Sequence, residues 1–280
     1  MNLPSRIAYH VVYDESLEGS LRYASENNWT DIVPDISVPR FSPHLYSKGT
    51  REQLCNLSKE LEIEWGFHAP GDDVNLSVTY PPIRAAILEY FRSIVDFARD
   101  LSSGTTNLVI HAGDIPHFRK ANRVEDDFAN DYAETYRLAL ISSISELIDY
   151  GYPDVLIVLE NHKWNPITLK TIDELVSIGL KLCLDIPKLY ISDFTLNESD
   201  WEVFVRNKDA IEVVHIHDYI PGLGSHQIIG SGSIDFFDVL SFLNKISKNL
   251  QYVVEVRPRD DALLSLKNFS HLLDNFGFSL

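Results

Sequence analysis

The sequence has few cysteines and few basic residues, and it lacks long apolar runs. Its two cysteines, Cys55 and Cys183, lie far apart in unlike apolar contexts, so we expect reduced core residues and not a disulfide or a catalytic pair. No stretch has the length and apolar character of a secretion signal or a membrane span, and we therefore expect a cytoplasmic protein. Only 24 basic residues face 41 acidic ones, and the net charge of −17 disfavours nucleic acid and anionic membranes as partners.

Low-complexity tracts and linkers of proline, glycine or serine are also absent, which favours one domain over residues 1–280. What recurs is a short β-branched run, a polar turn and a segment with helical apolar spacing. The pattern predicts strands at 6–12, 30–36, 62–68, 107–113, 154–160, 180–185, 212–218 and 252–256. It predicts helices near 15–27, 50–61, 83–102, 125–149, 168–178, 198–207, 234–247 and 260–275.

The number and size of these units favour an α/β fold of the (β/α)8 TIM barrel type. Eight strand–helix units in 280 residues leave about 35 residues for each, close to what a strand, a helix and two short loops require. An open doubly wound sheet is the alternative, but YDESLEG, after the first strand, contains one glycine and no G-x-G-x-x-G motif. In a barrel, the chemistry lies at the carboxyl ends of the strands.

Six of the predicted strands end in side chains that bind protons or metals. They are His68, His111, Glu160, Asp185, the pair His215 and His217, and Glu255. Because the strands of a closed parallel barrel converge on one mouth, these residues would lie close together. Buried carboxylates cost several kcal/mol unless a cation is near, and a divalent metal supplies one. Mixed imidazole and carboxylate ligands favour zinc, manganese, iron or cobalt, and no C-x-x-C or H-E-x-x-H motif competes for the assignment.

Strand seven and the loop after it leave alternatives open. Alternation sends His215 and His217 to one face and Asp218 to the other, so both histidines can point inward and one or two can bind metal. The stretch GLGSHQIIGSGSIDF either closes backbone amides on an anionic group or is a loop that needs positive φ angles. Single strand-end histidines are more often hydrogen-bonded core residues. His10 and His162, near the predicted mouth, are candidates for substrate contact.

These residues resemble those of the xylose isomerase-like barrels, which include sugar and sugar-phosphate isomerases and epimerases, inosose dehydratases and the endonuclease IV apurinic endonucleases. The resemblance runs through GFHAP, LVIHAGD, VLENH, LDIPK, VVHIHDY, H-x-x-x-G-x-G-x-I-D and VVEV and covers nearly the whole chain. It implies a core metal site made of Glu160, Asp185, His215 and Glu255. Family members commonly show H-x-x-D in strand seven, which favours His215 over His217 as the ligand.

The endonuclease branch of this superfamily binds further metals, and the match to it is incomplete. His68 and His111 match positions that bind a further zinc there, and His226 matches a ligand of a third metal. Lys188, however, stands where those enzymes have a third-metal histidine, and Gly224 stands where they have an aspartate. The resemblance therefore argues against a three-metal centre.

The resemblance implies an isomerase or epimerase that acts on a small carbohydrate. A divalent metal, zinc or manganese before cobalt, iron or magnesium, would stabilise an enediolate when a proton is removed beside a carbonyl. Glu160 and Glu255 would be the acid/base pair on opposite faces of the substrate carbon. The expected substrate contacts are Lys188, His217, Arg257 and His162. Of these, Lys188 and Arg257 would offer positive charge to a phosphate or carboxylate, although a salt bridge to a neighbouring acid is the more common role for such a lysine.

Other functions remain open at this point. An apurinic endonuclease or phosphodiesterase would use two or three metals to activate water, and a polyol dehydratase would share the metal site. A barrel that binds a metal or a sugar without turnover belongs to a different class. Intact Glu160 and Glu255 argue against binding alone, because binding does not need a carboxylate on each side of the substrate. The sequence leaves open whether the protein forms a homo-oligomer.

Overall fold

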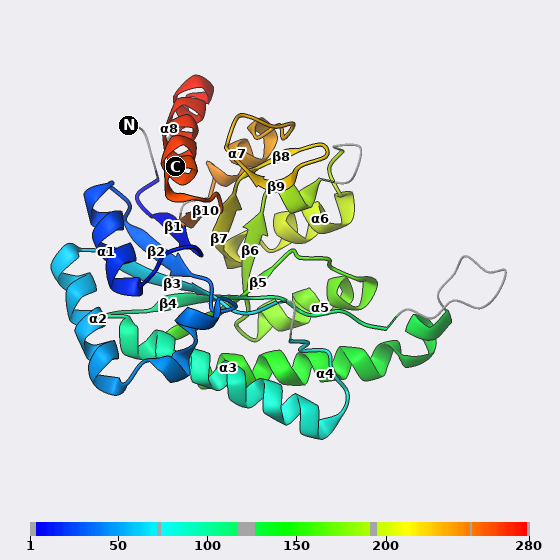
Figure 1. The fold of residues 1–280 in the computed structure, drawn as a ribbon. Helices are drawn as coiled ribbons and strands as arrows, with labels where there is room; N and C mark the ends of the chain where they lie inside the picture. Colours follow the sequence, from blue (N-terminus) through cyan, green and yellow to red (C-terminus); the bar gives the residue numbers. More distant parts are fainter. Residues whose placement is uncertain (1–3, 72–73, 117–126, 191–194, 247, 279–280) are drawn as a thin grey trace.

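The fold is a closed barrel of eight parallel strands with helices on its outside (Figure 1). The computed structural model describes residues 4–71, 74–116, 127–190, 195–246 and 248–278. The barrel strands are β1 (Ile7–Val11), β2 (Asp31–Pro34), β3 (Glu64–His68), β4 (Thr106–Ile110), β5 (Val155–Glu160), β6 (Lys181–Asp185), β7 (Ile211–Ile216) and β10 (Gln251–Val254). They pair in the order β1-β10-β7-β6-β5-β4-β3-β2, and β2 closes the ring against β1. The (β/α)8 barrel is confirmed and the doubly wound alternative is wrong, whereas the extent of the domain stays a prediction.

The helices lie where the apolar spacing predicts them. They are α1 (Leu17–Glu26), α2 (Lys48–Leu61), α3 (Pro81–Leu101), α4 (Asp127–Gly151), α5 (Pro166–Ser177), α6 (Glu198–Arg206), α7 (Phe237–Leu243) and α8 (Arg259–Phe276). Short 3-10 helices span Pro39–Phe41, Pro43–Leu45, Pro187–Leu189 and Lys208–Ala210. Local caps explain several starts: the Ser16 side chain accepts a hydrogen bond from the backbone N–H of Gly19 before α1, and Asn165 accepts from two N–H groups before α5.

Alternate strand residues point into the barrel and form layers, as the two-residue period of a strand requires. A compact layer of small apolar side chains fills the middle of the barrel and is separate from the larger core between strands and helices. Its members are Ala8, Val33, Val109, Val158, Cys183, Val213 and Val253. Two residues further along the strands, the inward positions carry imidazoles and carboxylates. The apolar layer therefore separates these groups from the opposite end of the barrel.

A polar network occupies the barrel interior at the amino ends of the strands. The carboxylate of Asp31 accepts hydrogen bonds from Arg6 and from the amide of Gln251, each at 2.6 Å. Gln251 in turn accepts a hydrogen bond of 3.1 Å from Asn107. Gly66 lies beside this network, where a Cβ atom would come within 2.9 Å of the Gln251 amide. A small residue at this position and paired polar groups together fill the end of the barrel.

The segment after β7 differs from the predicted loop. It folds into an antiparallel hairpin of β8 (Asp218–Ile220) and β9 (Gly224–Gln227), which Figure 1 shows beside α7. Gly222 and Gly224 have positive φ angles of 84° and 91°, which a tight turn between the two strands requires. The need for positive φ angles is thus confirmed, and helix α7 is shorter than the predicted helix at 234–247.

The sequence predicts reduced core cysteines and no membrane-spanning segment. Cys55 and Cys183 are both free and buried, as expected of core residues. Within the described ranges, none of the helices combines the length and the apolar character that crossing a bilayer demands.

The polar network at the closed end of the barrel generates a stability prediction. Asp31 is buried and bonds to both Arg6 and Gln251, so Asp31→Ala leaves a cation and an amide without their acceptor. We expect the free energy of unfolding to fall by about 3 kcal/mol. Arg22→Ala removes the exposed pair with Glu18 and should cost about 0.5 kcal/mol or less. Denaturant unfolding followed by circular dichroism measures both, and equal losses would contradict the structural role of the network.

Candidate metal centre

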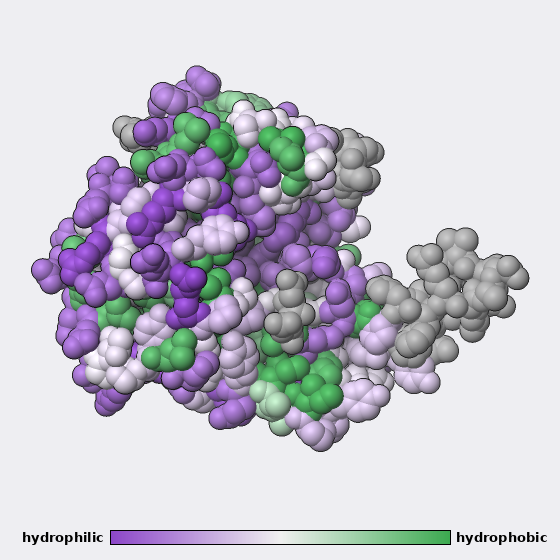
Figure 2. Space-filling model, viewed as in Figure 1, coloured by the Kyte–Doolittle hydropathy of each residue, from purple (hydrophilic) through white to green (hydrophobic). Residues whose placement is uncertain are grey.

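The carboxyl ends of the barrel strands bring imidazoles and carboxylates together in a buried cluster. Four groups of three residues each place their ligand atoms within 4.8 Å of one another. These groups are His68–Glu160–His215, His111–Glu160–His162, His217–His226–Glu255 and Asp185–His215–Glu255. Figure 2 shows that hydrophilic residues gather around the hollow near the centre of the viewed face. Residues from distant parts of the chain thus meet at one mouth, as the convergence of parallel strands requires.

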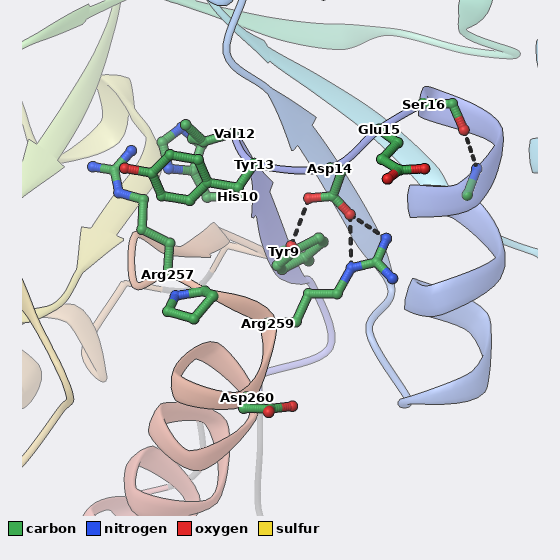
Figure 3. A pocket seen from close by; sticks show the side chains of 12 residues that line it. Tyr9, His10, Val12, Tyr13, Asp14, Glu15, Ser16, Arg257, Arg259 and Asp260 are labelled. Carbon is green, nitrogen blue, oxygen red and sulfur yellow. Dashed lines mark hydrogen bonds and ion pairs between the residues drawn. The ribbon is translucent and has the colours of Figure 1, made fainter.

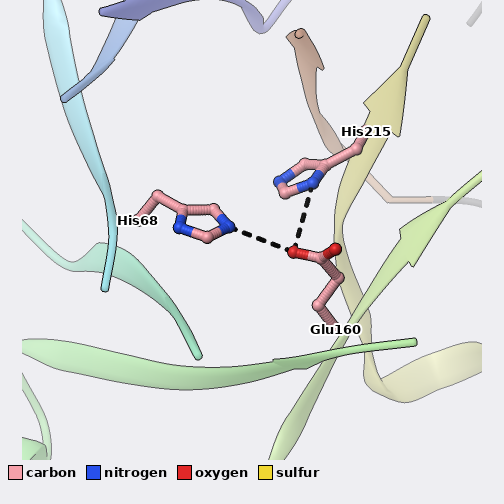
Figure 4. A group of neighbouring side chains, drawn as sticks. All are labelled: His68, Glu160 and His215. Carbon is pink, nitrogen blue, oxygen red and sulfur yellow. Dashed lines mark hydrogen bonds and ion pairs between the residues drawn. The ribbon is translucent and has the colours of Figure 1, made fainter. Parts of the chain in front are cut away.

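Glu160, the last residue of β5, links three histidines. Its Oε2 atom lies 3.1 Å from the Nε2 atoms of both His68 and His111. The Nδ1 atom of His215 lies 3.5 Å from the same oxygen, and Figure 4 shows the rings of His68 and His215 directed toward it. The Glu160 side chain has no exposed surface. A single buried carboxylate oxygen therefore has three imidazole nitrogens around it.

His215 also faces the other two buried acids. Its Nδ1 atom lies 3.3 Å from Oε1 of Glu255 and 4.0 Å from Oδ2 of Asp185. Both acids are buried, with relative exposures of 3% and 0%. The four residues that were expected to form the core metal site, Glu160, Asp185, His215 and Glu255, are therefore neighbours in the structure.

The His215 ring gives a direct test of whether a cation fits here. Both of its ring nitrogens are buried, and neither has a hydrogen-bond partner within the described residues. A buried polar atom without a partner costs about 1–3 kcal/mol, so such atoms call for a missing ligand. Carboxylates and a neutral imidazole form a donor set that suits zinc, manganese, cobalt or iron. The residues present therefore fit a divalent transition metal.

His217 and His226 form a second pair of imidazoles on the other side of Glu255. His217 Nε2 lies 3.4 Å from Asp185 Oδ2 and 3.7 Å from Glu255 Oε2. The His226 ring packs on that of His217 at 4.4 Å between centroids, and its Nδ1 lies 3.6 Å from Glu255 Oε2. Both strand-seven histidines thus point inward, as alternation predicts. Only His215 approaches all three acids, which supports the preference for it.

Lys188 supplies an internal cation to the cluster. The 3-10 turn Pro187–Leu189 folds the chain back after β6, and the Asp185 side chain accepts a hydrogen bond of 3.2 Å from the backbone N–H of Lys188. The ammonium group then pairs with Glu160 and, at 2.8 Å, with Asp185. Its charge is therefore balanced by two carboxylates of the cluster.

Neighbouring charges keep the acids ionised although they are buried. Burial would raise the pKa of Glu160 and Asp185, but the charge of Lys188 lowers both. The pKa of Glu160 falls well below its usual range and that of Asp185 falls to about 2. At Glu255, burial would also raise the pKa, but the neighbouring histidines lower it, and the pKa is well below its usual range. Burial would lower the pKa of His68, yet its hydrogen bond to Glu160 raises it to about 9. Strong negative charge thus persists at the barrel mouth.

Asp218 has a structural role in the loop after β7. Its carboxylate accepts hydrogen bonds from the backbone N–H groups of Tyr219, Gly230, Gly232 and Ile234, at 2.8 to 3.2 Å. A Cβ atom on Gly232 would collide with this carboxylate. The backbone amides of the glycine-rich loop therefore do close on an anionic group, but this group belongs to the chain itself.

His162 extends the cluster on the side of His111. The two rings stack at 4.2 Å between centroids, and the buried Nδ1 atom of His162 has no hydrogen-bond partner within the described ranges. A cavity of about 190 Å³ opens beside them and is also lined by Gly71 and Asn75. A Cβ atom on Gly71 would collide with the His111 ring, so glycine is required there. His162 thus lies at the edge of the site, where a substrate contact is predicted.

A larger cavity of about 560 Å³ adjoins the cluster between the ends of β1 and β10 (Figure 3). Its walls include His10 and the stretches 12–16 and 257–260. His10 is fully buried, and its Nδ1 atom lies 3.9 Å from Oε1 of Glu255. Burial lowers the pKa of His10 to about 3, so this ring is neutral. The cavity therefore reaches His10, one of the residues that surround Glu255.

Two residues of this site were not singled out from the sequence. Asp35, after β2, places its Oδ2 atom 3.9 Å from Nε2 of His10 and belongs to the same layer. Its two-residue spacing from the inward-pointing Val33 is the signal that could have found it. Asn161 pairs with the backbone of Asp185 through two hydrogen bonds, at 2.7 and 3.0 Å. It fixes the end of β6 against β5, which alternation alone does not reveal.

Several solved structures, among them a sugar epimerase, share this fold. A D-tagatose 3-epimerase-like protein is 23% identical with a TM-score of 0.73, and 97% of this chain and 98% of that chain are covered. A D-psicose 3-epimerase from Clostridium cellulolyticum with D-tagatose is 12% identical with a TM-score of 0.69, covering 98% and 99%. A protein of Thermus thermophilus soaked with ZnCl2 is 20% identical with a TM-score of 0.68, covering 96% and 98%. At these identities, the likeness establishes the fold alone.

Sequence comparison identifies the family. Two uncharacterized proteins of Methanocaldococcus jannaschii are similar to this chain. One is 27% identical over 272 residues, which cover 94% of this chain and 87% of that protein. The other is 25% identical over 225 residues, which cover 78% and 80%. The model of the xylose isomerase-like TIM barrel family matches residues 29–272, and the chain therefore belongs to this family.

Proposed function

We propose that this chain is a metal-dependent sugar or sugar-phosphate isomerase or epimerase that moves a proton beside a carbonyl group. The observation that carries the proposal is the pair of buried carboxylates of Glu160 and Glu255, which lie 3.5 and 3.3 Å from the Nδ1 atom of His215. Family membership and the sugar 3-epimerases among the structural neighbours support the same chemistry. A small carbohydrate is the proposed partner.

Glu160, Asp185, His215 and Glu255 would hold the divalent ion. The unpaired ring nitrogens of His215 and the acids that flank it support this set. Zinc or manganese is proposed ahead of cobalt, iron or magnesium, because zinc suits the imidazole ligand and manganese suits the carboxylates of the set. When bound, the ion would supply Lewis-acid polarisation of the substrate carbonyl, which makes the adjacent proton easier to remove.

The chain itself would move the proton. One glutamate takes the proton from the substrate carbon and the other returns one to the opposite face, which inverts that carbon. Return of the proton to the neighbouring carbon would give an isomerase instead. Glu160 and Glu255 are both kept ionised by their surroundings, so either can act as the initial base. Burial at the barrel mouth limits access of water to the reacting carbon.

The other predicted site residues would orient the substrate. His217 lies on the side of Asp185 and Glu255, and His162 lies on the side of His111, so the two can contact opposite ends of a sugar. Lys188 would hold Glu160 and Asp185 in place through its two ion pairs. His226 would close the pocket from the β8–β9 hairpin.

A metal-dependent phosphodiesterase is the second candidate. The observation that favours it is the position of His68 and His111, each with Nε2 at 3.1 Å from Glu160 Oε2, where a second ion would have an imidazole-rich site. Against it, Lys188 already pairs with Glu160, the carboxylate that a second ion would need, and the net charge of −17 repels a nucleic-acid backbone. A polyol dehydratase with the same metal site is a variant of the main proposal.

Metal binding should stabilise the protein measurably. At a metal concentration about 100 times the dissociation constant, binding adds about 2.7 kcal/mol, which raises the melting temperature by about 5 °C. We expect this rise with manganese, cobalt or zinc after treatment with a chelator, and its loss in His215→Ala and Asp185→Asn. Asp209→Asn, on an exposed turn away from the site, is the matched control and should keep the rise. No rise with any of these metals in the wild-type protein would rule out the centre.

Proton transfer should depend on both glutamates. Incubation in deuterated water with a panel of ketoses should introduce deuterium beside the carbonyl, as detected by mass spectrometry. Glu160→Gln and Glu255→Gln should each slow this exchange by about 100-fold or more, since a side chain that transfers protons contributes about that factor. Glu64→Gln, on the exposed start of β3, should leave it unchanged. Exchange that persists in both site variants would mean that other groups move the proton.

The two candidate functions differ in their action on DNA. We expect no cleavage of a duplex that contains an abasic site, in the presence of zinc or manganese, because Lys188 and the acidic surface disfavour a phosphodiester at this mouth. Gel electrophoresis of a labelled duplex measures this. Cleavage that requires Glu160 would transfer the assignment to the phosphodiesterase.

A further inference from the structure

Two cations lie at the barrel mouth, and their surroundings differ. Lys188 is paired with two carboxylates, Glu160 and Asp185, so its charge is already balanced within the protein. Arg257, two residues after Glu255, is half-buried and has neither a hydrogen bond nor an ion pair within the described residues. Of the two residues that the sequence offered as anion binders, only Arg257 therefore has unused charge and unused donors.

The unpaired state of Arg257 is unusual in this molecule. Each other arginine in the described ranges donates at least one hydrogen bond to a carboxylate or a backbone carbonyl. They are Arg6, Arg22, Arg40, Arg51, Arg84, Arg92, Arg99, Arg137, Arg206 and Arg259. A guanidinium carries five donors, and partial burial without acceptors costs free energy. In a chain with 41 acidic residues, the absence of an acidic partner for Arg257 among the described ones points to an acceptor from outside.

Arg257 lines the cavity of about 560 Å³, which has the volume of a pocket for a small ligand. Figure 3 draws no interaction to Arg257, whereas the side chain of Arg259 is directed to Asp14. Asp14 is occupied, because it accepts hydrogen bonds from both Arg259 and the hydroxyl group of Tyr9. The buried acid of this cavity therefore does not compete for Arg257.

The cavity adjoins the proposed reaction site at His10. His10 lines it and lies between it and Glu255, with its Nδ1 atom 3.9 Å from Glu255 Oε1. Glu255 and Arg257 are two residues apart, which corresponds to roughly 6–7 Å along an extended chain. That separation is comparable to the distance between an inner carbon of a monosaccharide and a group at its end. A sugar whose reacting carbon lies at Glu255 can thus place its terminal group at Arg257.

We propose that the substrate of this site carries an anionic terminal group, a phosphate or a carboxylate, which Arg257 binds in the cavity between the ends of β1 and β10. This proposal rests on the proposed isomerase or epimerase function and specifies its substrate class. The planar guanidinium group binds either anion through two parallel hydrogen bonds. Neutral ketoses would lack this interaction and would be poorer substrates.

The test compares a ketohexose such as D-tagatose with its 6-phosphate and its 6-carboxylate. In the metal-loaded wild-type protein we expect kcat/KM to be about 10- to 100-fold higher for one anionic sugar than for the neutral one. Arg257→Gln should remove this preference, mainly by raising KM for the anionic sugar. Arg257→Lys, which keeps the charge, should restore part of the preference. Arg206 is an exposed arginine of α6, and Arg206→Gln removes the same charge. This variant should leave kcat/KM for the anionic and the neutral sugars unchanged.

Binding of inorganic phosphate provides a readout that does not depend on turnover. Phosphate should raise the melting temperature of the wild-type protein and of Arg206→Gln, but not that of Arg257→Gln. If it does so while no sugar is turned over, the anion site stands and the proposed reaction is wrong. If sugars are turned over but Arg257→Gln keeps the wild-type ratio of anionic to neutral kcat/KM, the anion site is wrong and the reaction stands. Phosphate binding that is absent, or unchanged in Arg257→Gln, also overturns the proposal.

Discussion

The burial of three carboxylates in one small volume is the constraint on which the site depends. Glu160, Asp185 and Glu255 are almost without exposed surface, and each ion carries a desolvation penalty of several kcal/mol. Lys188 compensates this penalty on one side, because it pairs with Glu160 and Asp185. Around Glu255 the neighbours are imidazoles at 3.3 to 3.9 Å, of which His215 has no hydrogen bond within the described residues. The uncompensated negative charge is therefore concentrated beside His215, where a divalent cation would relieve it.

The barrel makes this concentration of charge tolerable. The layer of small apolar side chains below the acids fixes the strands at close spacing, and the polar network around Asp31 holds the far end. Asn161 ties the end of β6 to β5, and the loop amides that bind Asp218 hold the chain after β7. In a flexible loop, charge repulsion would move the three acids apart. Here they are held in place by strands and loops whose own hydrogen-bonding groups are paired. Because the ligands of such a site are already ordered, binding of a cation costs little further conformational entropy.

Local patterns explain how much of this could be predicted from the sequence. Apolar runs that end in His, Asp or Glu are visible residue by residue, so the eight strands and the convergence of His68, Glu160 and Asp185 follow from period and spacing. The β8–β9 hairpin and the bonds of Asp218 could not be predicted, because glycine-rich segments fit many backbone paths. A salt bridge from Lys188 to a neighbouring acid was expected, but the sequence did not identify Glu160 and Asp185 as its partners, since a long flexible side chain near a strand end can reach several acids.

The placement of lysine and arginine at this mouth follows from the shapes of their charged groups. An ammonium group is compact and can lie between the carboxylates of Glu160 and Asp185, where a planar guanidinium would need more room. A guanidinium at position 257 presents a flat pair of donors to an open cavity, where an ammonium would act as a point charge without orienting its ligand. Lysine thus stabilises the cluster from within. Arg257 has no such pair within the described residues and is available to bind a ligand in the cavity. The two cations therefore have different roles: Lys188 holds the acids in place, and Arg257 would select the ligand.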